Sequence, residues 1–163
     1  MARKDRAVSD AGPLIHLSQV SLLNQFLDTF DICVPEEVVS EIKNYMGRVK
    51  ARKVDLEPKY KDFSRMLSEK YSLGLGESES IALALQEKIR LFFTDDMDAR
   101  TASREYGLDP HGTVGIILRM YRNGVISKED VKKRIYALKE KSSLFVTKDI
   151  IEWIVKEIED YRK

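Results

Sequence analysis

The sequence predicts an α/β fold with a short-stranded, mostly parallel central sheet that is covered by helices on both faces. Short apolar runs alternate with longer segments in which apolar residues recur at helical spacing, and this alternation is typical of a parallel sheet connected by helices. The run over residues 91–94 opens with three consecutive apolar side chains, as expected of a strand buried on both faces. Binding sites in such sheets form beyond the carboxyl ends of the strands.

The first predicted strand covers residues 7–9 and stops at a turn that begins with Asp10. Gly12 suits the N-cap of the following helix, and Pro13 suits its first helical position. Apolar residues between positions 14 and 27 then recur at the spacing of an amphipathic helix.

The second predicted strand, residues 30–34, leads into a helix that opens at Pro35. Glu36 and Glu37 lie in its first turn, where the helix dipole favours acidic side chains. The basic segment 47–53 that follows shows no periodic pattern, which predicts a loop or a frayed helix end.

The middle of the chain continues the alternation of helices and strands. The expected elements are a helix over residues 56–71, a break at 72–76, a helix over 77–86, the buried strand over 91–94 and a helix from 95 to 106. A further short strand is expected near Leu108.

The remainder of the chain is predicted to be helical. One helix covers residues 113–121 and ends at an Asn-Gly pair. Ser127 is expected to cap a second helix, and the last amphipathic helix is expected to start at Thr147. Because no internal repeat or domain boundary is visible, we expect a single domain over residues 1–163, with a core over about 1–124 and extra C-terminal helices over 125–163.

Charge and cysteine content narrow the class of protein. Lys and Arg number 28 against 27 for Asp and Glu, so any nucleic-acid contact depends on local clusters of charge. The single cysteine excludes an intrachain disulfide. No signal peptide or membrane span is visible, which predicts a cytoplasmic protein without a membrane partner.

Four acidic residues stand out by their places in the predicted fold. Asp10 and Asp96 each follow a strand, and both suit a turn or a helix cap as well as a functional site. Glu41 lies at the margin of the buried face of its helix, where an exposed helix edge is the plainer interpretation. Glu77 opens a helix, where an acid also complements the dipole.

Together the four carboxylates indicate a metal site. Clustered carboxylates repel one another, and a divalent cation is a natural way to hold several ionised ones together. All-oxygen ligands favour hard cations such as Mg²⁺ or Mn²⁺. The sequence has no Cys/His set with zinc-ligand spacing, the segment 74–77 lacks the lysine and hydroxyl residue of a phosphate-binding loop, and no Ser-His-Asp arrangement is visible.

Four segments resemble, in order along the chain, the motifs of PIN-domain proteins, and the VapC-type toxin nucleases of prokaryotes are the most similar group. The matching segments are VSDAGPLI (8–15), VPEEVVSEI (34–42), GESESIALA (76–84) and FTDDMDAR (93–100). The resemblance implies a PIN-like three-layer α/β/α fold.

The resemblance also assigns roles to individual residues. It implies four catalytic residues that also bind the metal, and these are Asp10, Glu41, Glu77 and Asp96. The resemblance also implies three residues that would contact and orient these ligands, and these are Thr94, Asp95 and Asp98.

The third acid departs from the family pattern. It is usually an aspartate that opens a helix, whereas Glu77 stands here. Ser78 is an alternative for the strictly aligned position. Glu79, which is expected to face solvent, is a further candidate.

The implied activity is hydrolysis of RNA phosphodiester bonds with one or two Mg²⁺ or Mn²⁺ ions, leaving a 5′-phosphate and a 3′-hydroxyl. Arg100 would either pair with Asp96 or contact a phosphate. A basic run would bind the RNA backbone, although a solvated loop is an equally good interpretation, and it contains Lys43, Arg48, Lys50, Arg52 and Lys53.

The resemblance is compatible with two functional classes. The first is an endoribonuclease that is the toxin of a toxin–antitoxin pair, with an antitoxin partner and a homodimer built through the apolar stripes of the C-terminal helices. The second is a catalytically inactive PIN-like module that binds RNA or protein. Metal binding together with RNA turnover distinguishes the first class from the second.

Overall fold

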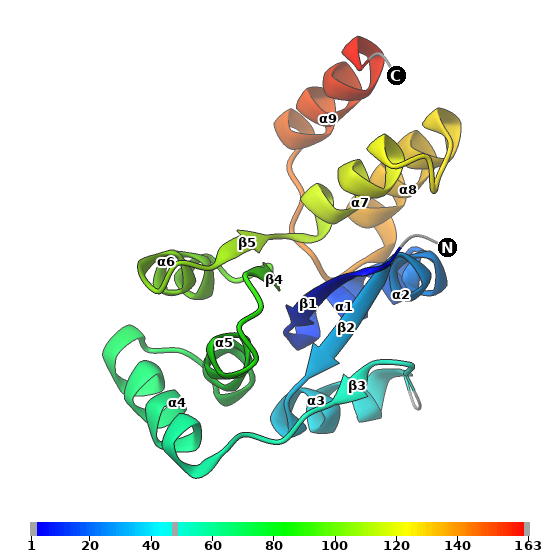
Figure 1. Ribbon diagram of the computed structural model, residues 1–163. Helices are drawn as coiled ribbons and strands as arrows, with labels where there is room; N and C mark the ends of the chain where they lie inside the picture. The colour runs from blue at the N-terminus through cyan, green and yellow to red at the C-terminus, as the bar shows by residue number, and fades with distance from the viewer. Residues whose placement is uncertain (1–2, 47–48, 162–163) are drawn as a thin grey trace.

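The computed structural model describes residues 3–46 and 49–161, with side chains described for 3–43 and 49–161. Within this part of the chain, the central sheet has the strand order β3-β2-β1-β4-β5 (Figure 1). The strands are β1 (Asp5–Ser9), β2 (Phe30–Val34), β3 (Arg52–Lys53), β4 (Leu91–Phe93) and β5 (Asp109–His111). All of these pairings are parallel, as the sequence predicts.

The register of the strands brings successive turns of the chain to one edge of the sheet. Ser9 of β1 pairs with Phe93 of β4, and Phe93 pairs with His111 of β5. The backbone N–H of Asp10 donates to the carbonyl of Phe93 at 3.0 Å, and that of Thr94 donates to the carbonyl of His111 at 2.9 Å. The residues that follow β1 and β4 are therefore held side by side.

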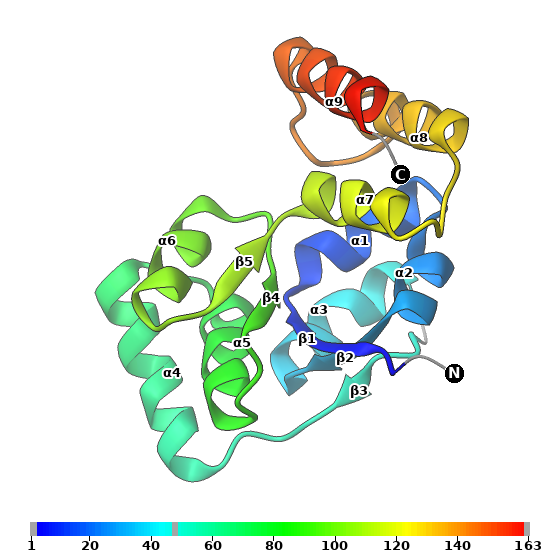
Figure 2. The same ribbon diagram turned by 45° about the horizontal axis from the view of Figure 1, so that its top comes forward.

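Helices cover both faces of the sheet, which confirms the predicted three-layer architecture (Figure 2). Successive strand residues point to opposite faces. Ala7 belongs to the core cluster that includes α1, α2, α3 and α7, whereas Val8 belongs to the cluster of α4, α5 and α6. The helices are α1 (Ala11–Gln19), α2 (Leu23–Thr29), α3 (Glu36–Met46), α4 (Pro58–Tyr71), α5 (Leu75–Gln86), α6 (Met97–Glu105), α7 (Thr113–Arg122), α8 (Lys128–Lys141) and α9 (Lys148–Asp160).

The start of α1 differs from the prediction. Asp10 is the N-cap in place of Gly12, and its carboxylate accepts a hydrogen bond from the Gly12 backbone N–H at 3.0 Å. A glycine has no side chain with which to accept such a bond. The apolar pattern over 14–27 divides into two helices, because the chain turns at Ser21 with a φ of 59°.

The segment 47–53 also differs from the prediction, because it contains a strand. Arg52–Lys53 forms β3 at the edge of the sheet and pairs with Cys33 and Val34 of β2. Both residues of β3 are exposed, so no apolar alternation marks the strand in the sequence.

The C-terminal helices extend the layer above α7. Helix α8 packs against α7 and α1, and α9 packs against α8 (Figure 2). Ser127 and Thr147 cap these helices as predicted. Ile151, Ile154 and Ile158 of α9 are buried and belong to the core cluster that includes α1 and α7. None of the described helices combines the length and the apolar character needed to cross a membrane.

Candidate active site

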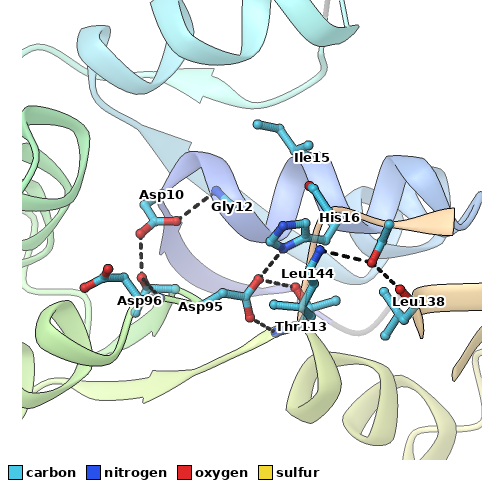
Figure 3. Close-up of polar contacts among 12 residues, drawn as sticks. Asp10, Gly12, Ile15, His16, Asp95, Asp96, Thr113, Leu138 and Leu144 are labelled. Carbon is cyan, nitrogen blue, oxygen red and sulfur yellow. Dashed lines mark hydrogen bonds and ion pairs between the residues drawn. The ribbon is translucent and has the colours of Figure 1, made fainter. Parts of the chain in front are cut away.

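The candidate site lies at the carboxyl ends of β1, β4 and β5, where three loops meet (Figure 3). Asp10 follows β1, Asp95 and Asp96 follow β4, and Thr113 opens the helix after β5. Acids from strand ends more than 80 residues apart in the sequence thus come together, because the parallel register places these strand ends at one edge.

Asp10 is the most buried of these acids. Its side chain caps α1 through Gly12, and its second carboxylate oxygen accepts a hydrogen bond from the Thr94 hydroxyl at 2.5 Å. Burial raises the pKa of Asp10 to about 7, with smaller contributions from the charges of Glu77 and Asp95, while the hydrogen bonds from Thr94 and Gly12 act to lower it. A cation near this carboxylate would favour its ionised form.

Thr94 links the acids that follow β1 and β4. Its hydroxyl donates to Asp10 and accepts a hydrogen bond from the backbone N–H of Asp96 at 3.2 Å. Asp96 caps α6, with one carboxylate oxygen accepting from the Ala99 N–H at 2.8 Å. The other oxygen of Asp96 is not used by the cap, and Asp96 lines the same hollow as Asp10.

Asp95 faces a different set of partners from Asp96. It accepts hydrogen bonds from the backbone N–H and the hydroxyl of Thr113, at 2.7 and 2.6 Å, and lies 2.6 Å from Nδ1 of His16 on α1 (Figure 3). Burial acts to raise the pKa of Asp95, but the hydrogen bonds from His16 and Thr113 outweigh it, so the pKa is lowered. Asp95 therefore ties the β4–α6 turn to α1 and α7.

Glu41 reaches the hollow from α3. A Cβ at Gly76, in the first turn of α5, would collide with the Glu41 carboxylate, so the two groups are in close contact. Burial raises the pKa of Glu41, and the charges of Glu37 and Glu77 add to the effect. Although Glu41 is exposed on its helix, its carboxylate lines the hollow.

Glu77 lies in the first turn of α5 and is half-buried. Its carboxylate accepts a hydrogen bond from the Gly74 N–H at 2.9 Å, which explains why α5 begins two residues earlier than predicted. Burial raises the pKa of Glu77, the Gly74 hydrogen bond opposes this, and the charges of Asp96 and Asp98 raise the pKa further. Asp98 itself is exposed in the first turn of α6.

The two alternatives to Glu77 point elsewhere. Ser78 is buried and donates to the carbonyls of Gly74 and Leu75. Glu79 is buried, which makes the predicted solvent exposure wrong, and it pairs with Lys61 of α4 at 2.8 Å. The sequence hid this pair because its members are 18 residues apart on different helices.

Asp10, Glu41, Glu77 and Asp96 line one hollow of about 250 Å³, and Asp95 borders it. The donor set fits a hard divalent cation, since all of its groups are carboxylates and the pKa values of three are raised partly by neighbouring acids. In the described part of the chain, however, no three Asp, Glu, His or Cys side chains are already arranged to hold an ion. The donor groups are therefore of the chemical type that binds such a cation, but their side chains are not already placed around one.

A family model described as a PIN domain matches residues 6–160. The chain belongs to the PIN-domain family. No protein of curated function matches it. PIN domains are generally nucleases, so the fold of this chain is a nuclease-type fold. The match includes the whole of α8 and α9, so the C-terminal helices lie within the family region.

Several basic residues of this PIN domain form hydrogen bonds or ion pairs within the protein that the sequence did not suggest. Arg100 donates to the carbonyl of Thr94 at 3.1 Å and lies 3.7 Å from Asp95. Of its two predicted roles, the pair with Asp96 is therefore not formed, and contact with a phosphate stays a prediction. Arg52 pairs with Asp31, and Lys53 lies near Glu36 and Asp55, whereas Lys43 and Lys50 are exposed. Arg48 lies outside the described residues.

Sequence reasoning gave no role in the site to His16, Thr113 or Gly76 of this PIN domain. His16 and Thr113 meet Asp95 across 79 and 18 residues of sequence. Thr113 was predicted only as the first residue of a helix, and its contact with a carboxylate was not visible in the sequence. Only the fold shows that Gly76 leaves room for Glu41.

Proposed function

We propose that this PIN domain is a divalent-metal-dependent endoribonuclease. The observation that supports the proposal is the gathering of Asp10, Glu41, Glu77 and Asp96 around one hollow at the carboxyl ends of the strands. Two acids that follow strands, Asp10 and Asp96, and two acids on helices, Glu41 of α3 and Glu77 of α5, line a space of about 250 Å³. Keeping them together without a counter-ion is costly, and a cation-dependent phosphodiesterase makes use of such a set.

These four carboxylates would hold one or two Mg²⁺ or Mn²⁺ ions. When bound, such ions would polarise the scissile phosphate and make water a better nucleophile. No side-chain nucleophile is required, and the expected products carry a 5′-phosphate and a 3′-hydroxyl.

The residues behind the carboxylates have a positioning role in this proposal. Thr94 fixes one oxygen of Asp10 through its hydroxyl and holds the backbone of Asp96. Asp95 binds Thr113 and His16, and so fixes the turn that carries Asp96. Partners of this kind typically change metal affinity or activity 10- to 100-fold when they are removed.

The proposal extends to a biological role. By resemblance to VapC-type toxins, the nuclease would act on RNA in the cytoplasm of a prokaryote, as the toxin neutralised by a small antitoxin, and would form a homodimer. Support for this extension comes from the family alone, so it stands separately from the proposed chemistry.

One observation favours a second candidate function, a PIN-like module that binds RNA or protein without cleaving it. Glu77 is committed to the Gly74 N–H, and in the described residues no three ligand side chains are already placed around an ion. RNA turnover distinguishes an inactive module from a nuclease whose side chains move to bind the cation.

The test compares the wild type with Asp10→Asn on labelled single-stranded RNA in Mn²⁺, Mg²⁺ or EDTA. We expect cleavage by the wild type that both EDTA and Asp10→Asn abolish. Asp149→Asn, an acid exposed in the first turn of α9, is the matched control and should cleave normally. Cleavage that survives Asp10→Asn would refute the assigned site. Binding of Mn²⁺ and RNA without any cleavage would favour the inactive module.

A further inference from the structure

A second hollow, of about 510 Å³, lies next to the carboxylate hollow. It is bounded by the start of α6, the β5–α7 segment and the chain from the α8–α9 connection into α9. We call it the aromatic groove and define it by Asp95, Met97, Arg100, Phe145, Ile150 and Trp153. Among these residues, the proposed function gives a role to Asp95 alone.

The groove gathers apolar side chains that the fold leaves in water. Phe145 is 87% exposed, Met97 66% and Trp153 53%, and Ile150 is also exposed. Single exposed apolar residues are ordinary, but several lining one hollow mark a binding surface. A volume of about 510 Å³ is also in the range of pockets that enclose a small molecule or part of a larger ligand.

The groove is continuous with the proposed active site. Asp95 lines both hollows, and Met97 directly follows Asp96 in the chain. A strand with its scissile phosphate at the carboxylates would therefore place a neighbouring nucleotide at the groove. The aromatic side chains that line the groove come from the α8–α9 connection and from α9.

The charge of the groove suits the same ligand. Arg100 lines it with a partly exposed guanidinium, which is anchored by Thr94 and Asp95. Asp95 is the one carboxylate among the lining residues, and its oxygens are already used by Thr113 and His16. Sites for single-stranded nucleic acids combine a cation for the backbone with aromatic side chains on which bases stack.

We propose that the aromatic groove binds nucleobases of a single-stranded RNA substrate beside the scissile phosphate. Bases stack on Trp153 and Phe145, and Arg100 contacts the flanking phosphate. This inference rests on the proposed function and adds to it a site for the bases and the residues that recognise them. A second copy of the chain is the less suitable occupant, since a stable protein interface buries a broad surface, whereas this hollow encloses only about 510 Å³ and has the Arg100–Asp95 pair among its lining residues.

Trp153 provides a direct test because it is the single tryptophan of the chain. The protein is titrated in EDTA, and again with Ca²⁺, with a single-stranded oligoadenylate of about eight nucleotides, a length in the usual site-size range. The control oligonucleotide has the same length and phosphate charge but is abasic. We expect Trp153 fluorescence to change with the oligoadenylate and not with the abasic strand. An equal response to both, or no response to either, would overturn the inference.

Matched variants separate stacking from a general effect on the surface. Trp153→Ala and Phe145→Ala should each weaken RNA binding about tenfold and raise KM with little change in kcat, while Trp153→Phe should restore most of the binding. Tyr136→Ala is the control, because Tyr136 is as exposed as Trp153 and lies on α8 outside the groove. Unchanged RNA binding in both alanine variants would refute the groove.

Failure of this inference is distinguishable from failure of the proposed function. RNA cleavage that depends on Asp10 but not on Trp153 or Phe145 would leave the nuclease standing without the groove. Base-dependent fluorescence changes without cleavage would leave the groove standing in an inactive module. A dimer in sedimentation that Phe145→Ala dissociates, with RNA binding intact, would assign the groove to a second copy and overturn the inference.

Discussion

At the scale of single residues, Asp10 has both of the roles that the sequence allowed. Its carboxylate caps α1 through Gly12 and also lines the acidic hollow, where the Thr94 hydroxyl holds its second oxygen. A cap is satisfied by one oxygen, so capping does not exclude ligand binding. The structural and functional interpretations of Asp10 and Asp96 are therefore compatible.

Burial of Asp10 makes the stability of the metal-free protein depend on pH. With a pKa raised to about 7, the folded state retains a proton that the unfolded state has lost, so stability falls as pH rises from the unfolded pKa towards about 7. The fall attributable to Asp10 should be roughly 1.4 kcal/mol per pH unit over this window. In EDTA, Asp10→Asn should flatten the fall and stabilise the protein at pH 8, as measured by urea denaturation. Parallel pH profiles for the two proteins would contradict the assigned burial.

At the scale of elements, the start of α5 shapes the hollow. Gly74 and Gly76 flank Leu75, and the close contact between Gly76 and the Glu41 carboxylate sets how α3 and α5 face each other. Glycine at position 76 leaves room for the Glu41 carboxylate, which a Cβ at this position would force to move. At position 74 a Cβ would meet Glu77 only at ordinary van der Waals distance.

This difference predicts the effect of two alanine substitutions. Gly76→Ala should displace the Glu41 carboxylate and lower Mn²⁺ affinity and RNA cleavage about 10- to 100-fold, with Tm little changed because alanine favours the helix. Gly74→Ala, the matched control, should lower the free energy of unfolding by at most about 1 kcal/mol, because alanine is a poorer N-cap than glycine, and should keep its activity. Isothermal titration with Mn²⁺ and the cleavage assay measure both. Wild-type behaviour of Gly76→Ala would show that Glu41 is not a ligand.

The sequence predicted most elements because their signals are local. Apolar periodicity and capping residues such as Ser127 and Thr147 specify helices within a few residues. The strand β3 escaped prediction because an exposed edge strand of two residues carries no such pattern. Pairings between distant elements, such as Asp95 with His16 and Glu79 with Lys61, depend on tertiary packing and leave no mark in a single sequence.

At the scale of the whole molecule, the C-terminal helices connect the core to the candidate substrate surface. The buried face of α9 carries Ile151, Ile154 and Ile158, and the same helix presents Trp153 to the aromatic groove. The groove is therefore held in place by core packing through α9. A change in the core beneath α9 should affect the groove as well.

Ile154→Ala tests this coupling, because Ile154 is fully buried and belongs to the core cluster. Removing it should lower the free energy of unfolding by about 2–5 kcal/mol, as for other buried isoleucines. Val125→Ala, at an exposed position before α8, should cost much less. In urea denaturation followed by both circular dichroism and Trp153 fluorescence, the two signals should change together in a single transition if α9 unfolds with the sheet. A separate, earlier fluorescence transition would instead show that α9 and the aromatic groove unfold independently of the sheet. In that case Ile154→Ala should lose RNA binding but retain its Mn²⁺ affinity.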